Sequence, residues 1–181
     1  MERGGRTMNT KLYKYVINLL ESRGVTLDDI AGVTYQLQED KISNLSMSEC
    51  SYAIRSVLGK RETQNAVMTG VGLDMQAENH LLPEPLQSII MNDEGLYGID
   101  ENIAMSICNV YGSIGITNYG YVDRMKTGFI KMLDTSKDQC NTFLDDLVGA
   151  IAAAGAAKLA HEQSGADYAN EGLELASQDD E

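Results

Sequence analysis

The chain has 181 residues and a mass of 19.8 kDa, the size of one domain, and 43% of its residues are hydrophobic, enough to bury a core without disulfides. Acidic residues outnumber basic ones 27 to 14, which gives a formal net charge of −13. This charge argues against a nucleic-acid-binding protein and against docking on anionic lipid through a basic face, and it favours metal cations or basic partners.

Helical hydrophobic periodicity dominates the chain, and strand-like alternation is hard to find. Thr26 with Asp29, and Ser46 with Glu49, have the spacing of N-terminal capping boxes. Gly59 and Gly70 are candidate breaks in one long helical pattern. We therefore expect about seven helices, over residues 9–24, 26–40, 46–82, 85–94, 100–111, 118–133 and 142–162.

The segment 149–157 is rich in Ala and Gly, so neighbouring helices can approach it closely. We expect an all-α, single multihelical domain over residues 8–164, with this Ala-rich helix at its centre. Residues 165–181 carry several acids and no bases, and we expect them to form an acidic, flexible tail.

The three cysteines are 58 and 32 residues apart, which speaks against a disulfide framework or a zinc site. The N-terminus lacks the apolar region of a signal peptide, and the longest apolar run, residues 147–157, is too short to span a bilayer. We therefore expect a cytoplasmic protein with no transmembrane segment. A zinc-hydrolase HExxH motif, a nucleophile elbow and a P-loop are all missing.

Paired acids are the remaining chemical signal. Asp100 and Glu101 open one predicted helix, Asp123 lies in the next, and Asp145 and Asp146 precede the Ala-rich segment. Carboxylates at helix N-termini are common because they offset the helix dipole. Asp145 and Asp146 stand in an otherwise apolar stretch, however, and adjacent helical residues point about 100° apart, so at least one of them should face the interior. If all five acids converge, a hard divalent cation would relieve their repulsion.

At these residues the sequence resembles the phosphatidylglycerophosphatase A family. Residues 98–104 (GIDENIA) look like its D-E segment, residues 123–126 (DRMK) like its D-x-x-K segment, and residues 144–150 (LDDLVGA) like its D-D segment. The stretches EPLQSI (84–89) and NVYGS (109–113) are similar to the soluble Bacillus-type branch. The match covers about residues 60–160.

The resemblance implies a Mg²⁺-dependent phosphomonoester hydrolase that converts phosphatidylglycerophosphate to phosphatidylglycerol. A soluble relative could instead act on a water-soluble phosphate ester, because the long apolar segments and the P-G-T motif of membrane-embedded members are absent here. The resemblance places catalytic roles on Asp146 and Lys126. The implied metal ligands are Asp100, Glu101, Asp123, Asp145 and Asp146.

A rival hypothesis is a non-catalytic acidic helical interaction protein, whose acids are helix caps scattered over the surface. A helical nucleotide pyrophosphohydrolase ranks third, since no two E-x-x-E pairs face each other in the pattern. A homo-oligomer is expected, because two-fold pairs are the commonest assembly of such proteins.

Overall fold

The structure is a computed structural model that describes residues 10–178, with side-chain environments for residues 11–164. Over this range the chain is all-α and contains no strand, which confirms the predicted fold class. Its helices are α1 (Thr10–Ser22), α2 (Leu27–Gln38), α3 (Met47–Leu58), α4 (Arg61–Glu78), α5 (Leu86–Met91), α6 (Ile99–Cys108), the 3₁₀ helix η1 (Asn109–Tyr111), α7 (Gly112–Met125), α8 (Gly128–Asp134) and α9 (Leu144–Gln178).

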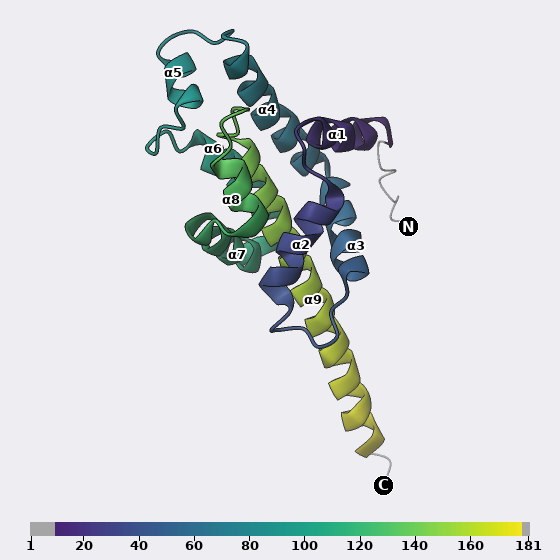
Figure 1. Ribbon diagram of the computed structural model, residues 1–181. Coiled ribbons are helices and arrows are strands. Elements are labelled where there is room, and N and C mark those ends of the chain that lie inside the picture. The colour runs from purple at the N-terminus through teal and green to yellow at the C-terminus, as the bar shows by residue number, and fades with distance from the viewer. Residues whose placement is uncertain (1–9, 179–181) are drawn as a thin grey trace.

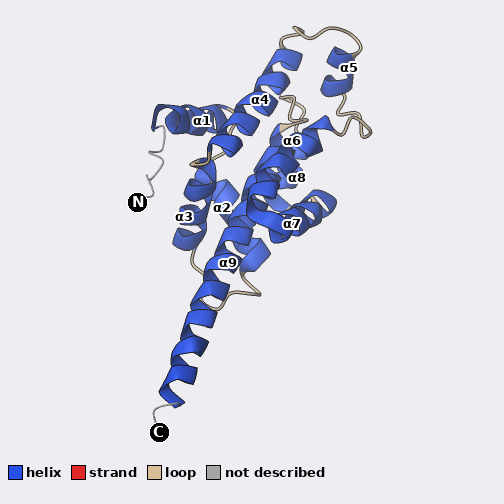
Figure 2. Ribbon diagram, turned by 180° about the vertical axis from the view of Figure 1, so that it is seen from behind, coloured by secondary structure: helices blue, strands red, loops and turns tan. Residues whose placement is uncertain are grey.

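Helix α9 forms the axis of the fold, and its first half packs against α2, α3, α6 and α7 (Figure 1). Its second half extends beyond the other helices, as the view from behind also shows (Figure 2). The central place predicted for the Ala-rich helix is therefore confirmed. The N-terminal end of α9 lies inside the bundle, whereas its C-terminal end lies outside it.

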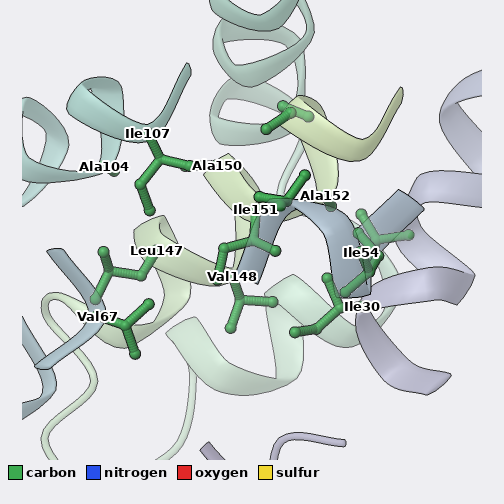
Figure 3. Packing of buried hydrophobic residues seen from close by; sticks show 14 of the residues in the cluster. Ile30, Ile54, Val67, Ala104, Ile107, Leu147, Val148, Ala150, Ile151 and Ala152 are labelled. Atoms are coloured by element: carbon green, nitrogen blue, oxygen red, sulfur yellow. The ribbon is translucent and has the colours of Figure 1, made fainter. Parts of the chain in front are cut away.

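Small residues on α9 explain this close packing. Leu147, Val148 and Ile151 on α9 are fully buried. The small side chains of Ala150 and Ala152 on the same helix leave room for larger side chains of neighbouring helices, such as Ile54 and Ile107 (Figure 3). A Cβ atom added at Gly155 would lie 2.7 Å from Ile54 Cδ1, well inside van der Waals contact. Larger residues on this helix would push its neighbours apart.

Local sequence signals set several helix ends. Both capping boxes form as predicted: the side chains of Thr26 and Ser46 accept from the backbone N–H groups of Asp29 and Glu49, and these acids accept from the cap residues in return. Gly24, which follows α1, has φ +77°, a left-handed conformation that glycine adopts without strain.

Two of the expected helices are divided in the structure, so the described residues hold more helices than the seven expected. Gly59 ends α3, whereas Gly70 lies inside α4. The helix expected over 118–133 instead begins at Gly112 and stops at Lys126, whose left-handed backbone (φ 34°, ψ 60°) ends α7 before α8 begins. Helix α9 continues past 162 to Gln178, and the flexibility expected for residues 165–181 stays a prediction.

The three cysteines are free thiols buried in this fold. Burial raises the pKa of Cys50 to about 11 and that of Cys108 to about 12, so neither is a reactive thiolate near neutral pH. No helix within residues 10–178 is both long enough and apolar enough to cross a bilayer.

Candidate functional site

One cavity collects the charged residues singled out in the sequence. It has a volume of about 90 Å³, and its lining residues come from the α5–α6 connection, the start of α6, the end of α7 and the start of α9. We call it the acid cavity. Its lining consists of Asp93, Glu94, Gly95, Gly98, Asp100, Glu101, Asp123, Lys126, Thr142, Asp145 and Asp146.

Asp145 and Asp146 form the innermost wall of the acid cavity. Only 3% and 6% of their surfaces are exposed, so both face the interior. Burial is the main reason that the pKa of Asp146 rises to about 8, and repulsion from Asp145 and Asp100 raises it further. Burial also raises the pKa of Asp145, to about 6, although Lys126 opposes this rise.

The first turn of α9 is held in place by Asp74 of α4. Its fully buried carboxylate accepts from the backbone N–H groups of Phe143 (3.1 Å) and Leu144 (3.0 Å). Burial raises the pKa of Asp74 to about 8, although these two bonds favour its charged form. An acid 70 residues earlier in the chain thus caps the helix that carries the two buried aspartates.

A second set of bonds fixes the segment just before α9. Arg23 donates to the Glu78 carboxylate (Nη1 to Oε2, 2.9 Å) and to the carbonyl of Cys140 (2.8 Å). The N–H of Cys140 donates to Glu78 (2.7 Å). Thr142, which lines the acid cavity, donates from its hydroxyl to the carbonyl of Ile90 (2.6 Å). The approach to α9 is therefore tied to the α1–α2 turn, to α4 and to α5.

Asp100 and Glu101 reach the cavity from the start of α6. Gly98 precedes this helix with φ +65° and brings no capping side chain, and Asp100 accepts from the N–H of Glu101 instead (2.9 Å). Asp100 is buried and Glu101 is exposed. The pKa of Glu101 is raised, first by partial burial and then by repulsion from Asp123.

Lys126 is the cation in the lining of the acid cavity. Its Nζ donates to Asp134 (2.6 Å) and to Asp145 (3.0 Å). Burial lowers the pKa of Lys126, but the bonds to these two carboxylates outweigh burial and raise it overall. Asp123, three residues earlier on α7, is half-buried and lines the same cavity. The ammonium group therefore stays charged and close to the α9 aspartates.

Several neighbours of the cavity escaped the sequence analysis. Asp93 is on the connection after α5, and partial burial of its carboxyl group raises its pKa. Asp134 holds Lys126 from α8. The Tyr119 hydroxyl is buried without a hydrogen-bond partner, and burial followed by repulsion from Asp146 raises its pKa. The one sequence signal for Tyr119 was its spacing of four residues from Asp123 on α7, because residues four apart lie on the same face of a helix.

A divalent cation suits the chemistry of this lining. The lining holds seven carboxyl groups and one ammonium group, and carboxylate oxygens are hard donors of the kind that Mg²⁺ prefers. The hydroxyl group of Tyr119, which is buried without a hydrogen-bond partner, adds an unsatisfied polar group nearby. Within the described residues, however, no three His, Cys, Asp or Glu side chains are arranged so that they could hold a metal ion as they stand. The residues suit the cation by type, and their side chains would have to move in order to coordinate it.

The comparison with protein families bears on this cavity. The model of the family "Phosphatidylglycerophosphatase A" matches residues 26–161. This range includes the six site residues expected from the sequence: Asp100, Glu101, Asp123, Lys126, Asp145 and Asp146. The chain belongs to the phosphatidylglycerophosphatase A family. The resemblance noted in the sequence is thereby confirmed.

Similar proteins share both sequence and fold. The uncharacterized protein YpjQ of Bacillus subtilis is 52% identical over 86% of this chain and 87% of its own length. The crystal structure of YpjQ superposes on this fold with a TM-score of 0.83, and the match covers 87% of this chain and 98% of the YpjQ chain in the crystal structure. The uncharacterized protein YutG of the same organism is 51% identical over 78% of this chain and 86% of its own. The low temperature requirement C protein of Listeria monocytogenes is 50% identical over 84% and 97% of the two chains, with a TM-score of 0.82.

Proposed function

We propose that this protein is a Mg²⁺-dependent phosphomonoester hydrolase, acting on phosphatidylglycerophosphate or on a soluble phosphate ester. The observation that carries the proposal is that the five acids and the lysine singled out by the resemblance line one cavity. A surface set of helix caps would have left these side chains apart.

The charge of the cavity supports a cation-dependent reaction. A phosphate monoester carries up to two negative charges, and seven carboxylates with one ammonium group would repel it. Asp100, Glu101, Asp123, Asp145 and Asp146 are the proposed ligands. Bound Mg²⁺ would polarise the phosphoryl group and lower the pKa of a water molecule.

The residues of the chain would bind and orient the ester. Lys126 is already held at 3.0 Å from Asp145 and would act as a point charge on a phosphoryl oxygen. Asp146, whose burial raises its pKa to about 8, is the proposed proton acceptor or ligand at the bottom of the cavity. The hydroxyl of Tyr119 would donate to an oxygen nearby, which would satisfy its missing hydrogen bond.

The direct test is release of inorganic phosphate from phosphatidylglycerophosphate in detergent and from a panel of soluble phosphomonoesters, with and without Mg²⁺. We expect Mg²⁺-dependent release by the wild type and a loss of at least about 100-fold in Asp146→Asn, since removing one group that acts in the transition state costs several kcal/mol. Asp40→Asn, an exposed acid of the α2–α3 connection, is the matched control and should keep full activity.

Equal release by wild type and Asp146→Asn would remove this aspartate from the mechanism. No release from any ester, together with no rise in melting temperature on adding Mg²⁺, would favour the acidic interaction protein instead. The cytoplasmic location and the homo-oligomeric state stay predictions that fractionation of cells and light scattering would check.

A further inference from the structure

A second pocket lies at the corner where η1 joins α6 to α7, and basic residues outnumber acidic ones in its lining. It has a volume of about 280 Å³, and its lining residues come from the end of α3, the α3–α4 connection, η1 and α9. We call it the basic pocket. Its lining consists of Ser56, Lys60, Tyr111, Lys158, His161 and Glu162.

The basic pocket and the acid cavity lie at opposite ends of the same helices. The start of α6, the end of α7 and the start of α9 line the acid cavity, whereas η1, between α6 and α7, and a later turn of α9 line the basic pocket. Asp146 and His161 are 15 residues apart on α9, which corresponds to about 22 Å along the helix axis. A small ligand in one of the two therefore does not reach the other.

Lys60 gives the basic pocket a cation that no acid neutralises. Its side chain is exposed and forms no ion pair within residues 11–164. Lys60 is also the N-cap residue of α4, and no side chain caps this end of the helix. The positive end of the α4 dipole thus lies beside an unpaired ammonium group, and both favour an anion.

Lys158 is the second cation of the pocket, and the surrounding side chains already hold it in place. Only 18% of its side chain is exposed, and its Nζ lies 5.6 Å from the centre of the Tyr52 ring. The same Nζ donates to Glu162, whose side chain is half exposed. Because exposed ion pairs contribute little in water, an arriving anion would compete with Glu162 for Lys158 at a small cost.

Tyr111 adds a hydrogen-bond donor. Its hydroxyl group is buried and has no partner within the described residues, which is costly for a polar group. Burial raises the pKa of Tyr111 to about 12, so the hydroxyl keeps its proton near neutral pH and can donate it to a ligand oxygen. His161 fixes this corner, since its Nε2 lies 3.4 Å from the carbonyl oxygen of Tyr111.

We propose that the basic pocket is a binding site for a phosphate-like dianion, either the free ion or the head group of an organic ligand. Lys60 and Lys158 would balance its charge, and Tyr111 would donate to one of its oxygens. A water molecule needs about 10–15 Å³, so the pocket has room for an organic group beside the ion. The inference does not depend on the proposed function, because this ligand is bound away from the acid cavity and is not hydrolysed.

The first test is isothermal titration calorimetry in EDTA with phenylphosphonate, whose C–P bond is not hydrolysed, with inorganic phosphate and with benzoate. EDTA keeps divalent cations out of the acid cavity, whose seven carboxyl groups then repel the same anions. We expect phenylphosphonate to bind saturably and benzoate, which carries one charge, to bind more weakly. Tighter binding of phenylphosphonate than of phosphate would support an organic ligand, and equal binding would support the free ion. Saturable binding of neither would overturn the proposal.

Three variants test whether the lining itself binds the dianion. Lys60→Gln should weaken the binding of phenylphosphonate at least about five-fold, because it removes a charged donor. Lys137→Gln, an exposed lysine of the α8–α9 connection outside this lining, removes the same charge and should stay within about two-fold of wild type. Glu162→Gln removes the competing acid and should tighten binding by about two- to five-fold. Equal weakening by Lys60→Gln and Lys137→Gln, or weaker binding by Glu162→Gln, would contradict the proposal.

NMR of the backbone amides gives the place of binding. In EDTA, phenylphosphonate should shift the signals of residues 111–112 and 158–162, and those of residues 100–101 and 145–146 should stay nearly unchanged. Shifts confined to residues 100–101 and 145–146 would overturn the proposal, because the dianion would then occupy the acid cavity. Absence of hydrolysis for every ester would end the hydrolase proposal alone, since none of these measurements requires turnover.

Discussion

Replacing Asp146 with Asn should make the metal-free protein more stable, although it should abolish the proposed activity. The pKa of this carboxyl is about 8 in the folded protein against an ordinary value of 3.8, and burial is the main cause. The folded state therefore binds the proton more tightly than the unfolded chain does. Stability accordingly falls as the pH rises from about 4 to about 8, and an uncharged Asn removes this loss.

The pKa difference bounds the size of the gain. At pH 7.5 it corresponds to about 5 kcal/mol, since each pH unit between 3.8 and 7.5 contributes 1.36 kcal/mol. Side-chain relaxation and entering water reduce this figure in real proteins, so we expect a gain of at least about 1 kcal/mol. For a chain of this length, that gain raises the melting temperature by about 2–4 °C.

The assay is thermal unfolding in EDTA at pH 5, 6, 7 and 8, for the wild type, Asp146→Asn and the exposed control Asp40→Asn. The advantage of Asp146→Asn should grow from pH 5 to pH 8, and Asp40→Asn should show none. Excess Mg²⁺ should then raise the wild-type melting temperature more than that of Asp146→Asn. A variant that is less stable than wild type at pH 8 in EDTA would refute the reasoning.

Two further substitutions test how the site is supported. Gly70→Ala on α4 should lower the free energy of unfolding, measured by urea denaturation, by about 1–3 kcal/mol, because the added Cβ would lie 2.9 Å from Phe143 Cβ. The control is Gly72→Ala on the same helix, where the added Cβ meets nothing within 4 Å. This variant should be neutral or stabilised by up to about 1 kcal/mol. Asp74→Ala should cost about 2–4 kcal/mol, because it leaves the N–H groups of Phe143 and Leu144 without a buried partner; an unchanged urea midpoint would contradict its role as the cap of α9.

The sequence was most informative where a residue breaks a local pattern. The capping boxes at Thr26 and Ser46 form because all their partners lie within three residues. Asp145 and Asp146 were conspicuous as charges inside an apolar helix, and the structure places both in the interior.

The residues that the sequence did not reveal depend on distant partners. Asp74 looks like an ordinary helical acid, because the N–H groups that it caps lie about 70 residues further along the chain. Lys126 was read as part of a continuous helix, since the left-handed residue is a lysine and the nearest glycine, Gly128, comes two residues later. Asp93 lines the cavity, and Tyr119 lies close to Asp146, only because α5 and α7 pack against their neighbours.

The two sides of the acid cavity differ in how firmly they are held. Asp145 and Asp146 stand on a helix that is enclosed by the core and capped by Asp74, so their backbone is a fixed reference. Asp93 and Glu94 stand on the exposed connection 92–98, which has two glycines in the cavity lining. If a cation binds, the connection 92–98 would therefore move toward Asp145 and Asp146, which stay in place. The positions of these two aspartates on α9 would then set where the cation lies.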